Sequence, residues 1–172
     1  MFKMLEQRLM DYIDSHPLYD VNTFYDVVLQ NHKIAIFKMQ HRIRDRIQHM
    51  LNTNENVFFI TMTFDDNHLP KSNDDKIKSI DDVIEFMRKN NVTAFVANID
   101  YGKDNGRFHW HAVAQSVYDF SHIHWTQGAV NFKRVPKTQI PLKLSRYLVK
   151  LQRHAVKITD PLMVYYPYRY KK

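Results

Sequence analysis

The segment Phe108-His109-Trp110-His111-Ala112-Val113-Ala114 decides how this chain is expected to fold. Aromatic and β-branched residues dominate it and neither glycine nor proline interrupts it, so it is predicted to be a β-strand. Because side chains alternate between the two faces of a strand, His109 and His111 share one face. The other face carries the core-facing Phe108, Trp110, Ala112 and Ala114. Two imidazoles so placed can bind one divalent metal ion through neutral ring nitrogens.

A second predicted strand, Ala94–Asp100, precedes the histidines. The connecting residues 101–107 hold two of the three glycines of the chain beside an Asp-Asn pair, which is typical of a tight turn in an antiparallel hairpin. With a loop at residues 103–106, Asp100 lies opposite His109, and the Cβ atoms of such a pair are ~5 Å apart. The hairpin therefore predicts a His-His-Asp metal site. A register slip of one residue would turn Asp100 to the other face and leave an ordinary solvated hairpin.

Composition bounds the class of protein. The chain has 172 residues, of which 44% are hydrophobic and 13% aromatic, which is enough for one ordinary core and argues against overall disorder. Cysteine is absent, which excludes a disulfide framework and a thiolate zinc site. No apolar run approaches the ~18 residues of a membrane span, and the N-terminus lacks the apolar core of a signal peptide. We therefore expect a soluble, cytoplasmic protein with no membrane partner.

The positive charge is concentrated in the last third of the chain. The formal net charge is +7, but residues 122–172 hold eleven Lys or Arg and one acid, Asp160, which makes that part +10 and the rest −3. Such asymmetry favours a polyanionic partner, most often nucleic acid. The alternative is a solvated basic surface without a specific partner.

Helical periodicity dominates the N-terminal third. Apolar residues recur at three- and four-residue spacings over Phe2–Asp14 and again from about Asn22 to Asn52, which predicts two helices. We expect residues 1–54 to form a helical extension that packs on a domain of residues 55–172.

Further strands and one helix complete an expected α+β fold in which helices flank an antiparallel sheet. Val57–Phe64 is predicted to be a central strand, with Thr61 and Thr63 on a polar face, and Val130–Val135 a further strand. Ser79 is expected to cap a helix that ends near Asn90, after a loop that continues to Lys78.

The segment Leu142–Ala155 is predicted to be an amphipathic helix that carries a candidate nucleophile, Tyr147. Its buried stripe is Leu144, Leu148, Leu151 and Ala155, and the adjoining face carries Lys143, Tyr147, Lys150 and His154. Cations around a tyrosine favour both its phenolate form and a bound phosphate. The alternative is a tyrosine that simply packs at the margin of the helix.

Three segments, in this order, resemble the motifs of rolling-circle replication initiators of the HUH endonuclease superfamily. They are Phe58–Phe64 for the first motif, His109–His111 for the His-hydrophobic-His motif and Tyr147–Lys150 for the Tyr-x-x-Lys nucleophile motif. The resemblance covers about Val57 to Ala155. The segments Thr61–Pro70 and Asp100–His109 are similar to the initiators of microvirus-type single-stranded DNA phages, which usually have Glu where Asp100 stands and Pro where Phe108 stands.

The resemblance implies a ferredoxin-like or RRM-like antiparallel sheet of about five strands. It implies nicking and rejoining of single-stranded DNA through a 5′-phosphotyrosine, with Tyr147 as nucleophile and Lys150 stabilising charge. His109, His111 and Asp100 would hold Mn²⁺ or Mg²⁺, with Gln115 as an alternative third ligand. The residues expected to bind DNA are Thr61, Thr63, Lys143, Arg146 and Arg153. The expected partners are an origin stem-loop, a host helicase and a host polymerase.

Three alternatives to a replication initiator stay open at this point. A single-tyrosine HUH transposase typically has Gln four residues after the tyrosine, whereas here Leu151 occupies that position and Gln152 follows it. A relaxase would use the same chemistry. A non-catalytic RRM-like module would keep the basic residues and aromatics without needing two histidines and an acid. The phosphate-binding Gly-x-x-x-x-Gly-Lys motif of a fused helicase does not occur in the sequence.

Overall fold

The computed structural model describes residues 21–101, 107–120, 123–148 and 164–166. The chain separates into two units, residues 1–39 and 40–172, and helix α2 belongs to both. The helix predicted over Phe2–Asp14 lies outside the described residues. The packing of a helical extension on the domain stays a prediction. None of the helices in the described ranges combines the length and the apolarity needed to cross a membrane.

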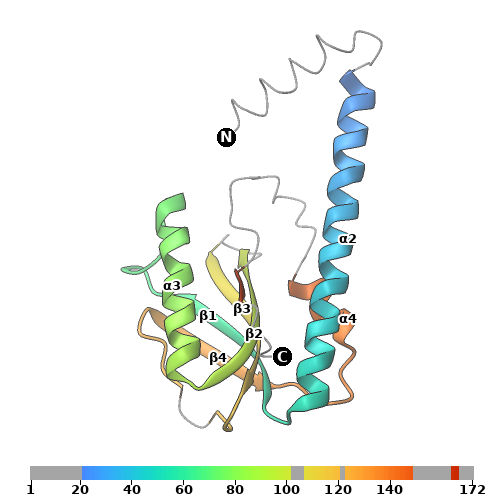
Figure 1. The fold of residues 1–172 in the computed structure, drawn as a ribbon. Helices are drawn as coiled ribbons and strands as arrows, with labels where there is room; N and C mark the ends of the chain where they lie inside the picture. The colour runs from blue at the N-terminus through green and yellow to red at the C-terminus, as the bar shows by residue number, and fades with distance from the viewer. Residues whose placement is uncertain (1–20, 102–106, 121–122, 149–163, 167–172) are drawn as a thin grey trace. The chain divides into compact units, whose positions relative to one another are not determined.

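Three helices and four longer strands make up most of the described chain (Figure 1). In order they are α2 (Val21–Thr53), β1 (Val57–Phe64), α3 (Asn73–Lys89), β2 (Val92–Tyr101), β3 (Phe108–Ser116), β4 (Gly128–Arg134) and α4 (Pro141–Leu148). The helix predicted from about Asn22 to Asn52 is confirmed as α2.

The strands form an antiparallel sheet in the order β4-β1-β3-β2, and a three-residue strand β5 (Val164–Tyr166) pairs with β2. The α+β class and the antiparallel sheet are confirmed. Val57–Phe64 is an interior strand, as its apolar composition predicted, because β4 and β3 pair with its two edges. The ferredoxin-like or RRM-like arrangement with about five strands stays a prediction.

One face of the sheet, here called the core face, packs against α3. The β1 residues that alternate onto it are Phe58, Ile60, Met62 and Phe64, all buried. Val83, Phe86 and Met87 of α3 join the same apolar cluster as these residues and Trp110. Figure 1 shows α3 along this side of the sheet. Burial of so many large apolar side chains is the main stabilising contribution that this layer makes.

The helix predicted to start at Ser79 is longer than expected, and that prediction was wrong. Helix α3 begins at Asn73, and Ser72 is its N-cap. Ser72 and Asp75 form a reciprocal capping box, which satisfies the first N–H groups of the helix. Ser79 instead lies buried inside the helix, where its hydroxyl donates to the Lys76 carbonyl and accepts from Trp110 Nε1 at 3.0 Å. That tertiary hydrogen bond explains a polar residue at a core position.

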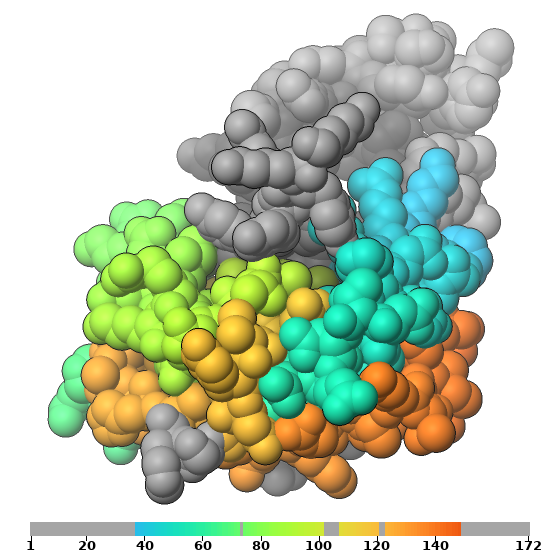
Figure 2. Space-filling view, turned by 60° about the horizontal axis from the view of Figure 1, so that its bottom comes forward, coloured from blue at the N-terminus to red at the C-terminus, as the bar shows by residue number. Residues whose placement is uncertain are grey.

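The opposite side of the sheet carries α4 and the C-terminal part of α2. Figures 1 and 2 show residues 40–53 of α2 beside α4. Ile43, Ile47, Met50 and Leu51 of this part of α2 are buried at helical spacing, so the helix presents one apolar stripe. Leu148 of α4 is also buried. The part of the sheet that α2 and α4 leave uncovered is therefore limited, and polar residues there have defined surroundings.

Replacing Gly128 with alanine is expected to destabilise the fold. A Cβ atom at Gly128 would lie 2.3 Å from the Thr63 carbonyl oxygen and 2.6 Å from the Asp65 nitrogen, both backbone atoms of paired β1 and its following turn. Its φ of +156° adds a conformation that side chains disfavour. We expect Gly128→Ala to lower the free energy of unfolding by about 2 kcal/mol or more in chemical denaturation. Thr126→Ala, an exposed change in the same turn, is the control, and equal stability of the two variants would contradict the packing argument.

Candidate metal centre and nucleophile

Asp100, His109 and His111 meet on the sheet face opposite the core face, here called the histidine face. The register pairs Asp100 with His109 and Asn98 with His111, as the hairpin predicted. Asp100 Oδ2 lies 3.3 Å from His111 Nε2 and 3.9 Å from His109 Nε2. One ligand atom from each residue falls within 4.8 Å of the others, which is compact enough for a single ion.

Each histidine is anchored through its Nδ1 atom, which leaves Nε2 directed into the cluster. His109 Nδ1 is 2.9 Å from the Arg107 carbonyl, and His111 Nδ1 is 3.0 Å from Thr61 Oγ1. A carbonyl only accepts, so His109 donates from Nδ1 and, when neutral, keeps its lone pair on Nε2. Such outer hydrogen bonds are how proteins set the tautomer and the ring orientation of metal-binding histidines.

The two Nε2 atoms are only 3.0 Å apart, beside a nearly buried carboxylate. Two lone pairs at that separation repel unless a proton or a metal ion lies between them. His111 is 6% exposed and Asp100 8%, so water gives little screening. Two neutral nitrogens and one carboxylate form a donor set that suits a divalent transition metal and accommodates Mn²⁺. The residues therefore fit the ion that the hairpin predicted.

Tyr147 of α4 reaches the same cluster from a segment 36 residues away. Its hydroxyl is 3.3 Å from His111 Nε2, and its side chain remains 43% exposed. Phe59 of β1 contacts both rings, with centroids 5.3 Å from His111 and 5.5 Å from Tyr147. The candidate nucleophile and the candidate metal ligands thus lie together, and the tyrosine stays accessible to a substrate.

Two contacts that sequence reasoning missed seat α4 on the sheet. The Asn98 side-chain amide donates to the Leu148 carbonyl at the end of α4. Ser145, fully buried, donates to the Leu142 carbonyl one turn earlier. Asn98 lies opposite His111 in the hairpin, so one strand position holds the helix and its neighbour contributes a histidine. The only signal in the sequence was that Asn98 shares a face with Asp100.

The other predicted site residues are distributed around this centre. Thr61 and Thr63 lie half-buried on the histidine face, opposite His111 and His109 respectively. Lys143 and Arg146 are exposed on α4. Lys150 and Arg153 lie outside the described residues.

Gln115, the alternative third ligand, does not lie with the histidines. It is four residues beyond His111 on β3, about 13 Å away at the usual rise of a strand. Its Oε1 accepts a hydrogen bond from Thr53 at the end of α2. Asp100 is therefore the oxygen ligand that the geometry offers.

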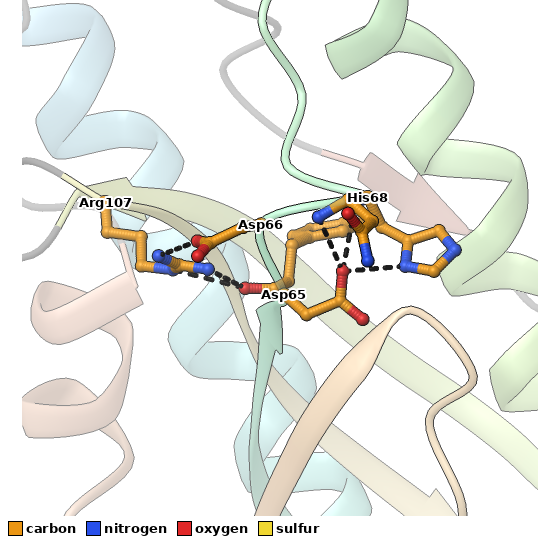
Figure 3. Close-up of polar contacts among 6 residues, drawn as sticks. Asp65, Asp66, His68 and Arg107 are labelled. Atoms are coloured by element: carbon orange, nitrogen blue, oxygen red, sulfur yellow. Dashed lines mark hydrogen bonds and ion pairs between the residues drawn. The ribbon is translucent and has the colours of Figure 1, made fainter.

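Arg107 is a second residue whose role the sequence did not indicate. Its guanidinium donates to the Phe64 carbonyl and forms an ion pair with Asp66 at 2.8 Å, while its own carbonyl accepts from His109 (Figure 3). It therefore ties the end of β1 to the start of β3 beside the metal centre. In the same turn, the His68 side-chain hydrogen bond lowers the pKa of the Asp65 carboxyl below its ordinary value.

Removing the Thr61 hydroxyl is expected to weaken metal binding. Thr61→Val keeps the shape of the side chain but deprives His111 Nδ1 of its partner at 3.0 Å. Loss of such an outer hydrogen bond typically lowers metal affinity by about 10- to 100-fold. Titration of Mn²⁺ followed by calorimetry measures the change, and Thr61→Ser, which retains a hydroxyl, is the matched control. Equal affinities for the Val and Ser variants would show that Thr61 does not orient the imidazole.

Comparison with known proteins gives one match. A family of replication-associated proteins, the ORF2 type, matches residues 57–154, more than half of the chain. No curated protein and no solved structure matches the chain. The matched range begins at the first residue of β1 and includes Asp100, both histidines and Tyr147.

Proposed function

Because this chain belongs to the ORF2-type family of replication-associated proteins, we propose that it is an HUH-type endonuclease that initiates rolling-circle replication. In this proposal it nicks and rejoins single-stranded DNA through a 5′-phosphotyrosine, as the microvirus-type initiators it resembles would. The observation that carries the proposal is the 3.3 Å separation between the Tyr147 hydroxyl and His111 Nε2, within a cluster that also holds Asp100 and His109.

The reaction is an in-line displacement at a DNA phosphate. Tyr147 Oη forms a bond to phosphorus as the bond to the 3′ oxygen breaks. The phenol loses its proton and the leaving oxygen gains one, which yields a 5′-phosphotyrosine and a free 3′-hydroxyl. A polymerase can extend that hydroxyl. Since the new ester keeps the energy of the old one, attack by a 3′-hydroxyl reverses the step and rejoins the strand.

The residues of the cluster divide the work. Asp100, His109 and His111 would hold Mn²⁺ or Mg²⁺, which when bound polarises and orients the scissile phosphate. Phe59 and the Asn98 bond to Leu148 hold the tyrosine near that point, as in-line attack requires. Lys150 is proposed to stabilise the charge that develops during the step.

DNA binding is assigned to the polar and basic residues around the cluster. We assign backbone contacts to Thr61, Thr63, Lys143, Arg146 and Arg153, in keeping with the basic C-terminal third. The proposed substrate is an origin stem-loop, with a host helicase and a host polymerase as later partners.

Affinity for single-stranded DNA is expected to fall with salt, partly through Arg146. Arg146→Gln removes one exposed cation next to Tyr147 and should lower the slope of log affinity against log salt by ~0.7, the value for one phosphate contact. Fluorescence anisotropy with a labelled oligonucleotide measures it. Lys89→Gln, on α3 at the other side of the sheet, removes the same charge and should leave the slope unchanged. Equal slopes for both variants would argue against a contact at Arg146.

One experiment tests the proposal as a whole. The protein is incubated with candidate stem-loop single-stranded DNA and Mn²⁺ or Mg²⁺, then denatured and resolved on a gel. We expect a denaturation-resistant protein–DNA adduct that maps to Tyr147 and is lost with EDTA. Binding without cleavage would instead favour the RRM-like module, and cleavage without an adduct would rule out tyrosine chemistry.

A further inference from the structure

A cavity of about 370 Å³ lies between the turn after β1, the start of α3 and the base of the β2–β3 hairpin. Three of its lining residues, Lys71, Lys76 and Arg107, are cations. Tyr101 and Phe108 supply aromatic walls. We call this cavity the Lys76 pocket.

The pocket lies at the same end of the sheet as the metal centre. Tyr101 pairs with Phe108 in the register, directly after the pair Asp100 and His109. Because successive residues of a strand alternate faces, Tyr101 and Phe108 lie on the core face while Asp100 and His109 lie on the histidine face. A polymer that passes around this end of the sheet therefore meets both sites in close succession.

The walls of the pocket are held in place by contacts within the protein. The Lys76 ammonium lies 5.4 Å from the centre of the Tyr101 ring, and that ring meets Phe108 edge to face at 5.9 Å. The Arg107 guanidinium is oriented by the Phe64 carbonyl and Asp66 (Figure 3). Cations beside an aromatic face are the two features that bind the phosphate and the base of a nucleotide.

We propose that the Lys76 pocket holds one nucleotide of single-stranded DNA close to the scissile phosphate. Lys71 and Lys76 bind its phosphate, and its base stacks on Tyr101 in place of the Lys76 ammonium. The inference rests on the proposed function for the identity of the polymer. It adds a second contact region, on the face of the sheet that does not carry the nucleophile, and so a way to select the strand that enters the active site.

A binding experiment without metal separates this proposal from nicking. The full chain is titrated in EDTA with an oligodeoxythymidylate of about 12 nucleotides, within the usual range of single-stranded sites, at several salt concentrations. Lys76→Gln should lower the salt slope by ~0.7. Lys78→Gln removes the same charge from an exposed position two residues along α3, outside the lining, and should leave the slope unchanged.

The aromatic wall is tested separately. Tyr101→Leu should weaken binding about fivefold or more without changing the salt slope, because stacking carries no charge. Tyr118→Leu, 65% exposed beyond the far end of β3, is the control. With 5-iodouracil in the oligonucleotide, photocrosslinking should label the peptide that contains Tyr101.

Specific outcomes overturn the proposal. Equal salt slopes for Lys76→Gln and Lys78→Gln, or a crosslink that never falls on Tyr101, would exclude the pocket as a DNA contact. Competition by free dTTP as effective as competition by the oligonucleotide would identify a mononucleotide site instead. If wild-type protein nicks DNA but the two lysine variants bind alike, the pocket assignment fails alone. If Tyr101 crosslinks but no nicking occurs, the proposed function fails alone.

Discussion

Tyr147→Phe is expected to abolish nicking, rejoining and the covalent adduct together, lowering the cleavage rate by about a thousandfold or more. One hydroxyl, 3.3 Å from His111 Nε2, carries all three activities in the proposed mechanism. The phenylalanine ring preserves the edge contact with Phe59, and the side chain is 43% exposed. The free energy of unfolding should therefore change by no more than about 0.5 kcal/mol. Gel analysis of the adduct, with DNA affinity measured in parallel, checks the result.

The control for this variant is a tyrosine that lies away from the cluster. Tyr118→Phe makes the same chemical change at an exposed position beyond the far end of β3 and should leave the adduct at its wild-type level. If the adduct persists in Tyr147→Phe and peptide mapping places it on Tyr165 or Tyr168, the nucleophile assignment is wrong and the C-terminal tyrosines replace it.

His109→Ala should have a comparable effect through the metal. It removes one of three converging ligand atoms, so affinity for Mn²⁺ should fall more than about 100-fold, beyond the loss from an outer hydrogen bond. Cleavage should be lost with it. The fold should persist, because His109 lies on the histidine face and contributes nothing to the apolar cluster on the other side. Calorimetric titration with Mn²⁺ and thermal unfolding measure the two effects.

His124→Ala is the matched control for that change. His124 is exposed between β3 and β4, outside the three-residue cluster, so its removal should leave metal affinity and cleavage unchanged. Normal cleavage by His109→Ala at limiting metal would refute the ligand assignment. Loss of the fold in His109→Ala would show that the cluster has a structural role.

The sequence by itself determined the hairpin and its convergent triad. The alternation of strand residues and the short connection leave one register that puts the apolar side chains of β3 in the core, and that register pairs Asp100 with His109. It also singled out Tyr147, because the apolar spacing of α4 and the surrounding cations are local patterns. Its error at Ser79 arose because Ser72 and Asp75 offered a competing cap, and because the buried partner of Ser79, Trp110, is 31 residues away.

Only the tertiary structure decided which polar residues act on the triad. Thr61, Asn98 and Arg107 each make a contact that joins segments 43 to 50 residues apart, and each could have faced solvent as far as local pattern can tell. Gly128 is another such case, since the backbone atoms that exclude a Cβ belong to β1 and the turn after it. Local periodicity sets which face a side chain occupies, whereas its partner depends on strand order and helix placement. The position of Tyr147 over His111 is therefore a product of the packed fold.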